Sequence, residues 1–278
     1  KKYDKALKCF DKLIKIDPKD LSAKMDKGTT LRFQRKYEDA LQCFDQILEM
    51  DTQATCPDCG KKHDSGKSQA LISKGVTFGQ LGDHRKALEY FEQALKISPN
   101  NRKALQNKAS ALDKLKMNDK ALECYQKLIK RNPRNPYYWV RKGNRLSFLG
   151  KRRKALVCYA KAIKLAPKDS PPVFSKGIAY EELCENQKAL ECYEKANNLE
   201  PKHGSLMKFR ALNSKARILG KLGRYQEQLD CYEIMLKNKA TALSNKPYDV
   251  KSQSKRYIVV KASMKEIKAK LRSEENLR

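Results

Sequence analysis

Residues 139–167 read WVRKGNRLSFLGKRRKALVCYAKAIKLAP and contain two helical patterns that meet near Gly150. In the second pattern, apolar residues recur at offsets of 0, 1, 3, 4, 7 and 8 from Ala155. This spacing places them on one stripe of a helix. The ring of Pro167 cannot extend the helical hydrogen-bond ladder, so the second helix is predicted to end there. Such a hairpin has more apolar surface than it can cover alone.

The same pattern recurs every 34 residues, which supplies the missing cover. Prolines, alanines and aromatic residues each keep this period. Their positions are Pro99, Pro133, Pro167 and Pro201; Ala87, Ala121, Ala155 and Ala189; and Phe91, Tyr125, Tyr159 and Tyr193. Units of this kind bury their apolar faces against neighbouring units. The period therefore predicts an all-α fold built as a stack.

The phased small, aromatic and proline residues resemble the tetratricopeptide repeat (TPR) family, in the form common in prokaryotic sequences. The resemblance covers residues 1–242. It implies a right-handed α-solenoid of 34-residue helix-turn-helix repeats, whose first helices line a concave groove that binds partners. One regular departure is a lysine where the family commonly has leucine, as at Lys74 and Lys142. We expect its stem to lie on the packed helices and its ammonium to stay in water.

The period also sets the predicted domain boundaries. A partial first repeat spans residues 1–20, so we expect the sequence to begin inside a repeat. The full repeats lie at about 21–54, 68–101, 102–135, 136–169, 170–203 and 209–242. Pro18 and Pro99 are thirteen residues further apart than two periods, which predicts an inserted loop at 54–66.

Residues 243–278 are predicted to form a linker and a C-terminal capping helix. Within 251–272, apolar residues alternate at spacings of three and four. They are Tyr257, Val260, Met264, Ile267 and Leu271. We expect this face to cover the last repeat. Docking of the same basic, amphipathic helix on a partner is the alternative.

The chain is strongly basic, with 61 Lys or Arg against 32 Asp or Glu and a formal net charge of +29. Such a charge attracts polyanions such as nucleic acid or an acidic protein partner. Basic residues occur in every repeat, so a lysine-rich solvated surface is the simpler interpretation. No apolar run approaches the ~20 residues that a membrane-spanning helix needs.

Six of the nine cysteines directly precede the aromatic residue of a second helix. They are Cys9, Cys43, Cys124, Cys158, Cys192 and Cys231. We expect them to pack as small buried hydrophobes, because they recur once per repeat. Unpaired thiols favour a reducing compartment, and hence a cytoplasmic location. Cys184 stands where other repeats have a turn glycine, and we expect it to be exposed.

Cys56 and Cys59 differ because they lie in the inserted loop, as CPDCG, with His63 four residues later. This spacing is typical of half a zinc site. Tetrahedral zinc needs four ligands, so Asp64 or a second molecule would have to complete the set. Zinc, a redox-active pair and a loop without ligand remain alternatives. The fold itself requires no cofactor. Copies of the chain could assemble through this loop or through the uncovered first helix.

No catalytic constellation surrounds any histidine, so the chain is predicted not to be an enzyme. The favoured function is a scaffold that binds a protein or peptide in the groove, and the alternative is binding of RNA or another polyanion. The predicted groove residues are Ile72, Val76, Gln106, Tyr137, Val140, Asn144, Phe174 and Ile178, with Gln69, Lys103 and Ser110 on the same face. We expect Ile72, Val140 and Phe174 to stand outside the core, so that changing Phe174 and Val140 to Ala leaves the fold intact.

The zinc hypothesis predicts metal in protein purified without chelator, either substoichiometrically or at one ion per dimer. Cys56→Ser should remove that metal and leave the helical circular dichroism signal unchanged, because the loop is an insertion. Elemental analysis measures the metal. Its absence from the unaltered protein would leave only the loop without ligand.

Overall fold

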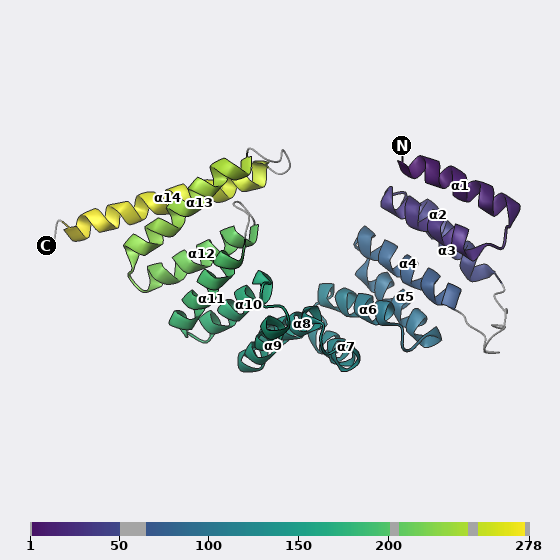
Figure 1. The fold of residues 1–278 in the computed structure, drawn as a ribbon, viewed down its shortest axis with the longest axis horizontal. Coiled ribbons are helices and arrows are strands. Elements are labelled where there is room, and N and C mark those ends of the chain that lie inside the picture. Colours follow the sequence, from purple (N-terminus) through teal and green to yellow (C-terminus); the bar gives the residue numbers. More distant parts are fainter. Residues whose placement is uncertain (1, 51–64, 201–205, 244–249, 276–278) are drawn as a thin grey trace. The chain divides into compact units, whose positions relative to one another are not determined.

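A computed structural model describes residues 2–50, 65–200, 206–243 and 250–275 (Figure 1). These residues form fourteen helices and no strand, which confirms the all-α class. The helices belong to two compact units, Lys1–Pro133 and Arg134–Arg278. Within the described ranges, no helix combines the length and the apolar character that a bilayer span requires.

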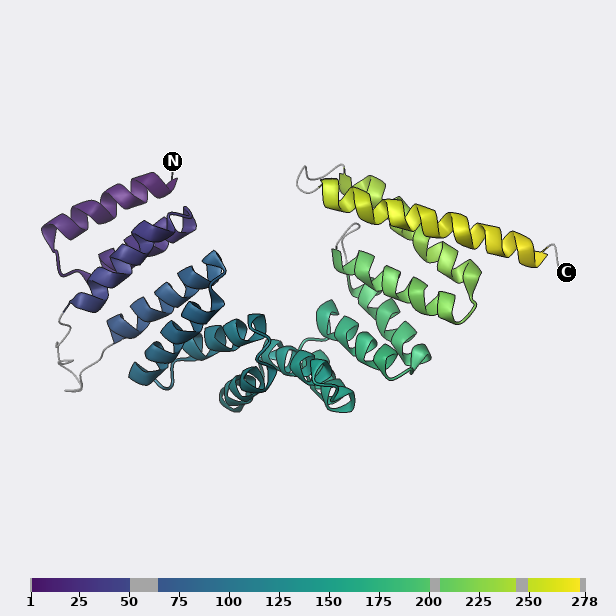
Figure 2. The same ribbon diagram turned by 180° about the vertical axis from the view of Figure 1, so that it is seen from behind.

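In the first unit, the first helix is single and the other six form three antiparallel hairpins. Figure 2 shows the hairpins α2–α3, α4–α5 and α6–α7 from behind. The helices are α1 (Lys2–Ile16), α2 (Leu21–Phe33), α3 (Tyr37–Glu49), α4 (Ser65–Leu81), α5 (His84–Ile97), α6 (Arg102–Lys114) and α7 (Asn118–Arg131). The first helix of each hairpin therefore carries an even number in this unit.

The second unit continues the hairpin pattern and ends with a single long helix. Its helices are α8 (Pro136–Phe148), α9 (Arg152–Leu165), α10 (Ser170–Glu182), α11 (Asn186–Leu199), α12 (Leu206–Lys221), α13 (Tyr225–Leu243) and α14 (Val250–Glu275). The hairpins are α8–α9, α10–α11 and α12–α13. The first helices α8, α10 and α12 again carry even numbers.

Every hairpin turns through one residue with left-handed backbone geometry. Three of these residues are glycines, which adopt a positive φ without steric cost: Gly82, Gly150 and Gly223. Arg35, Lys116 and Cys184 take the same conformation with side chains. Cys184 is exposed at this turn, as the sequence predicted.

Inside several hairpins, the aromatic ring of the second helix packs directly on a glycine of the first. A Cβ atom at that glycine would lie 2.5–2.7 Å from the ring. The pairs are Gly28 with Phe44, Gly75 with Phe91, Gly143 with Tyr159, and Gly177 with Tyr193. These four rings are buried. The small residue therefore sets how closely the two helices approach.

The capping helix is confirmed and slightly longer than predicted, at Val250–Glu275. Val260 and Ile267 are buried in one cluster with Tyr232 and Met235 of α13. The α14 apolar face therefore covers the last hairpin, as the alternating spacing indicated. The side chain of Tyr257 lies outside the described residues.

Two helices begin a few residues before the predicted repeats that contain them. Helix α4 begins at Ser65, so the last residues of the predicted insertion belong to a helix. Helix α12 begins at Leu206 and not near residue 209. Met207 and Phe209 pack against the core of the second unit, which explains why this stretch is helical.

The periodic cysteines are buried, with two exceptions. Cys43, Cys124, Cys158 and Cys231 are buried and Cys192 is half-buried. Cys9 is exposed, so the prediction was wrong there. Helix α1 has no buried residue, because the described neighbour α2 covers only part of it.

We predict that iodoacetamide near neutral pH modifies Cys9 and Cys184 and spares the four buried thiols. Burial raises the pKa of the Cys158 thiol, and raises that of Cys231 to about 11, so these groups stay protonated and unreactive. Peptide mass spectrometry of native and denatured protein measures the labelling. Equal rates for Cys158 and Cys184 in the native protein would contradict the assigned burial.

We also predict opposite effects of one substitution at two glycines of α4. Gly75→Ala should lower the free energy of unfolding by about 1–3 kcal/mol, because the new Cβ would overlap the buried ring of Phe91. Gly79→Ala should raise it by up to about 1 kcal/mol, since the nearest atom, Ala87 Cβ, lies 3.9 Å away.

Urea denaturation of the two variants measures this difference. In the next repeat, Ala109 occupies the position equivalent to Gly75, so the repeat can accommodate a Cβ atom there. The loss of stability in Gly75→Ala therefore measures how far the ring of Phe91 can shift to make room. Equal stability of the two variants would show that the ring is not the constraint.

Candidate functional site

The first helices α4 and α6 border a cavity of about 200 Å³ in the first unit, named here the α4–α6 cavity. Its floor is apolar and its rim is polar. The floor consists of Gly75, Ala87, Phe91 and Ala111, and the rim includes Val76, Gly79, Gln80, His84, Asn107, Ser110 and Lys114. Helix α5 supplies Ala87 and Phe91 to this floor, whereas Gly75 comes from α4 and Ala111 from α6.

The cavity exists because small residues leave its centre empty. A Cβ atom at Gly75 would strike Phe91, whereas one at Gly79 would meet only Ala87, at 3.9 Å. Gly75 therefore permits close packing, and Gly79, one turn later, leaves space at the surface. Ala111 on α6 limits the filling from the opposite side.

The rim groups give the cavity defined binding chemistry. Gln80 and Asn107 offer amides that can donate and accept hydrogen bonds, and Ser110 offers a hydroxyl. The exposed Lys114 adds one ammonium group. An apolar floor with a few polar groups around it suits one apolar side chain attached to a polar backbone.

Two residues of the predicted groove face, Val76 and Ser110, line this cavity. Ile72 is only 3% exposed and packs in the core with Ala104, so the expectation that it stands outside the core was wrong. Gln106 is half-buried and makes contacts of its own.

Sequence reasoning missed Gly79, Gln80, Asn107 and Lys114. The signal was available, because the face that holds Val76 continues three and four residues later at Gly79 and Gln80. The same step from Ser110 leads to Lys114. The predicted face ended at Val76 and Ser110, one turn short of these residues.

In the second unit, the predicted residues do not form one open strip. Tyr137 is 38% exposed, with the Arg141 guanidinium 5.0 Å from its ring centroid. Val140 and Ile178 are half-buried. Asn144 accepts a 2.9 Å hydrogen bond from the hydroxyl of Tyr159, so its amide oxygen already serves the hairpin.

Phe174 belongs to the core. It is 4% exposed, its ring lies 5.5 Å from that of Tyr193, and the Arg210 guanidinium lies 4.8 Å from its centroid. The expectation that Phe174 stands outside the core was therefore wrong, and we now expect Phe174→Ala to lower the stability of the fold, because the change would open a cavity beside Tyr193.

Charged groups cross-link the first helices α10 and α12. Arg217 forms two 2.8 Å contacts with the carboxylate of Glu181, and Lys221 lies 3.4 Å from it. The hydroxyl of Tyr193 donates a 2.8 Å hydrogen bond to the same carboxylate. Two cations share one buried acid, so this surface keeps a positive balance.

The lysine that departs from the family pattern has a structural role that the sequence did not indicate. Where an acid follows the aromatic residue of the preceding repeat, the lysine pairs with that acid. The pairs are Lys27–Asp11 (2.7 Å), Lys108–Glu92 (2.8 Å), Lys215–Glu194 (3.3 Å) and Lys74–Asp45.

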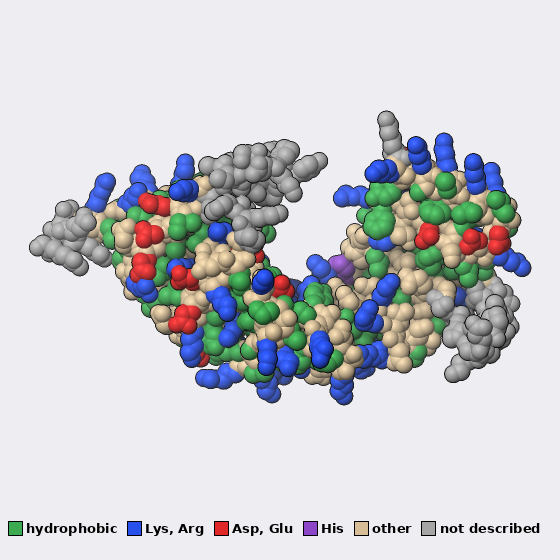
Figure 3. Space-filling view, in the orientation of Figure 1, with side chains coloured by type: hydrophobic (Ala, Val, Ile, Leu, Met, Phe, Trp, Pro, Cys, Tyr) green, Lys and Arg blue, Asp and Glu red, His purple; other side chains and the backbone are tan. Residues whose placement is uncertain are grey.

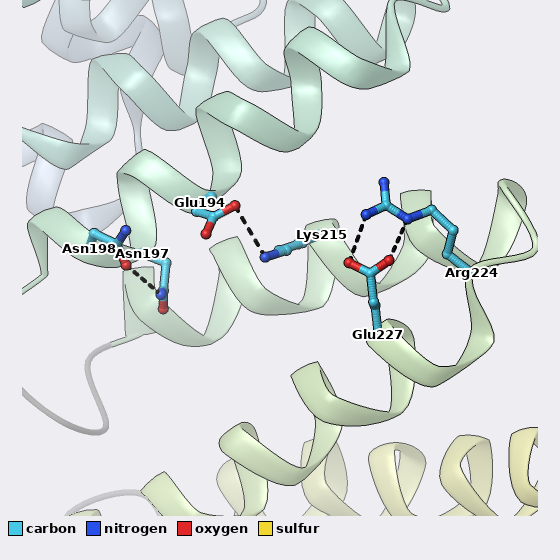
Figure 4. Close-up of polar contacts among 6 residues, drawn as sticks. All are labelled: Glu194, Asn197, Asn198, Lys215, Arg224 and Glu227. Carbon is cyan, nitrogen blue, oxygen red and sulfur yellow. Dashed lines mark hydrogen bonds and ion pairs between the residues drawn. The ribbon is translucent and has the colours of Figure 1, made fainter.

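Figure 4 shows Lys215 reaching from α12 to Glu194 on α11, near the separate local pair of Arg224 and Glu227. Lys74 is buried, so the expectation that its ammonium stays in water was wrong. Exposed pairs of this kind contribute at most about 1 kcal/mol each. Their main effect is to fix how the side chains of adjacent repeats are placed relative to one another.

The proposed zinc ligands Cys56, Cys59 and His63 lie outside the described residues. Among the residues that the structure does describe, no group of three or more His, Cys, Asp or Glu could hold a metal ion. Zinc binding by the inserted loop stays a prediction.

Three family models match the chain, and each is described as tetratricopeptide repeat. The first matches residues 80–142 and the second matches residues 19–100. The third matches residues 1–20, 136–169 and 173–203. The segments 1–20 and 136–169 of the third match coincide with repeats that the 34-residue period defines.

Two curated relatives match short stretches. A photosystem I assembly protein of Acaryochloris marina is 46% identical over 41 residues, which is 15% of this chain and 25% of that protein. An uncharacterized protein of Methanocaldococcus jannaschii is 47% identical over 45 residues, 16% of this chain and 52% of that one. The chain thus spans a quarter to about half of the length of these relatives.

Solved structures share the fold over longer ranges. YrrB, described as a TPR protein with an unusual peptide-binding site, has a TM-score of 0.57 at 23% identity and covers 73% of this chain and 96% of its own. MamA from Desulfovibrio magneticus gives 0.58 at 19%, covering 66% and 97%. A thermophilic TPR protein of Thermus thermophilus gives 0.51 at 26%, covering 69% and 98%. The chain belongs to the tetratricopeptide repeat family.

Proposed function

We propose that this chain is a protein-interaction scaffold that holds a peptide segment at the α4–α6 cavity. The observation that carries the proposal is the apolar cavity on the first helices, bordered by amides, a hydroxyl and one ammonium. Membership of a repeat family built for protein binding supports the general class. YrrB is described as having a peptide-binding site, which supports the more specific form.

The size and lining of the cavity favour a peptide with one apolar anchor. About 200 Å³ accommodates a single large aliphatic or aromatic side chain against Phe91. Gln80 and Asn107 can then bond the peptide backbone on either side of the anchor. Lys114 favours a carboxylate near it, from a side chain or a chain end.

The rim does not provide an activated nucleophile. Ser110 and His84 both line the cavity, but no hydrogen bond joins them in the described structure. A hydroxyl without an adjacent base is a poor nucleophile near neutral pH. Binding is therefore the activity that these groups support.

Filling the cavity tests the proposal. Peptides selected from a random displayed library on the unaltered protein should lose affinity for Gly79→Met, because the new side chain would occupy the anchor site. A buried anchor contributes about 2 kcal/mol, so the Kd should rise roughly thirtyfold. Isothermal titration calorimetry with a selected synthetic peptide measures this change.

Gln93→Met is the matched control, since it places the same side chain on the exposed outer face of α5. Lys114→Gln should weaken only those peptides that carry a carboxylate beside the anchor. Unchanged binding of every selected peptide to Gly79→Met would exclude the α4–α6 cavity as the site.

A further inference from the structure

The outer face of α9 carries a row of exposed cations with an exposed apolar residue among them. Lys154, Lys161 and Lys164 are exposed and recur at spacings of seven and three, which places them on one face. Arg153 is exposed beside them. Val157, between the first two lysines, is 68% exposed. These five residues are named here the α9 face.

Charge in this part of the chain is concentrated, contrary to the even spread that the repeats suggested. From residue 134 to residue 168, the sequence contains eleven Lys or Arg and no Asp or Glu. Figure 3 shows blue side chains over the α9 region, whereas red ones gather over α11–α13 and over α1–α3. The positive balance of the α9 face is therefore not neutralised by acids on its own hairpin.

Helix α7 provides an internal comparison, because it holds the equivalent place one repeat earlier. Its exposed lysines occupy the same three repeat positions: Lys120, Lys127 and Lys130. Where α9 has Arg153 and Val157, α7 has Asp119 and Glu123. Glutamate also holds the Val157 position in the flanking repeats, as Glu89 and Glu191. Only α9 has exchanged this acid for an exposed apolar residue.

The cations of the α9 face are also available. Among the described residues, Lys154, Lys161 and Lys164 have no ion-pair partner; Arg152 alone on this helix forms a pair, with Glu182 at 2.8 Å. The acid of the inter-repeat pairs is replaced by Ala160, and Lys176 instead lies 5.5 Å from the Tyr180 ring centroid. Three cations in the first turn of α9 also oppose the helix dipole.

An exposed aromatic residue closely precedes this charged helix in the sequence. Phe148, the last residue of α8, is 65% exposed. The turn that follows it reads FLGKRRK, so Lys151 and the first cations of α9 lie within a few residues of the ring. A free aromatic face beside a row of ammonium groups is the combination that single-stranded nucleic acids bind, by stacking bases and pairing phosphates.

We propose that the α9 face, with Phe148 at one end, binds single-stranded nucleic acid. Lysines at a spacing of one to two helical turns present point charges to a phosphate backbone, without the forked arginine pairs that would read bases. An anionic lipid surface attracts lysines by charge alone, and an acidic peptide can do the same, but neither presents a regular series of phosphates and stackable bases to the lysine row and Phe148.

Fluorescence anisotropy with a labelled, mixed-sequence single-stranded RNA tests the proposal across a salt series. Lys154→Gln, Lys161→Gln and Lys164→Gln, combined, should raise the Kd by roughly an order of magnitude at low salt. The slope of log K against log salt should fall by about 0.7 per lost phosphate contact, and so by about 2 for three. Phe148→Ala should raise the Kd roughly fivefold or more and leave the slope unchanged, because no charge is lost.

The combined Lys120→Gln, Lys127→Gln and Lys130→Gln variant is the matched control, because it removes the same charge from the same repeat positions. It should bind like the unaltered protein. Arg153→Asp with Val157→Glu gives α9 the acids of α7 and should abolish binding. Circular dichroism confirms that each variant folds.

Three results would overturn the proposal. Equal losses in the α9 and α7 lysine variants would reduce the effect to net charge. Binding of polyglutamate or anionic vesicles that depends on the α9 lysines, without RNA binding, would assign the face to another partner. A duplex of the same length bound as tightly, with no effect of Phe148→Ala, would exclude single-strand recognition.

Discussion

The structure depends on one repeated contact, in which a buried aromatic ring of the second helix packs on a glycine of the first helix. At Gly75, Gly143 and Gly177 the ring occupies the volume that a Cβ would need. Dispersion and apolar burial at this contact hold the two helices close enough to form a hairpin. This packing then sets the positions of the turn residue, the helix caps and the start of the next repeat.

Once the ring fixes the hairpin, the remaining positions are free to differ between repeats. On the first helices of the first unit, the glycine at position 79 leaves a space beside Val76 and Ser110. The outer surface of α9 uses this freedom to lose acids and expose Val157. Both candidate surfaces therefore arise at places that the core does not constrain.

Electrostatics between repeats decides which charges remain available. Where an acid follows the buried ring, the lysine of the next first helix pairs with it, as Lys108 does with Glu92. Where the acid is absent, as at Ala160, the lysine lies on an aromatic ring and its charge is not cancelled. The net charge of +29 is consequently less informative than the positions where carboxylates are missing.

The period of proline, alanine and aromatic residues by itself determined the all-α class, the hairpins and the turn position of Cys184, and the three- and four-residue spacing of apolar residues within 251–272 determined the capping helix, because these follow from spacing along the chain. It did not determine which side chains the core would use. Ile72 and Phe174 looked like spare apolar groups, yet the tertiary structure buries both, since burial depends on the neighbouring repeat as well as on the helix that carries the residue. The partner of Lys74, the space above Gly79 and the unpaired row on α9 were likewise decided only in three dimensions, where residues distant in sequence come within contact distance.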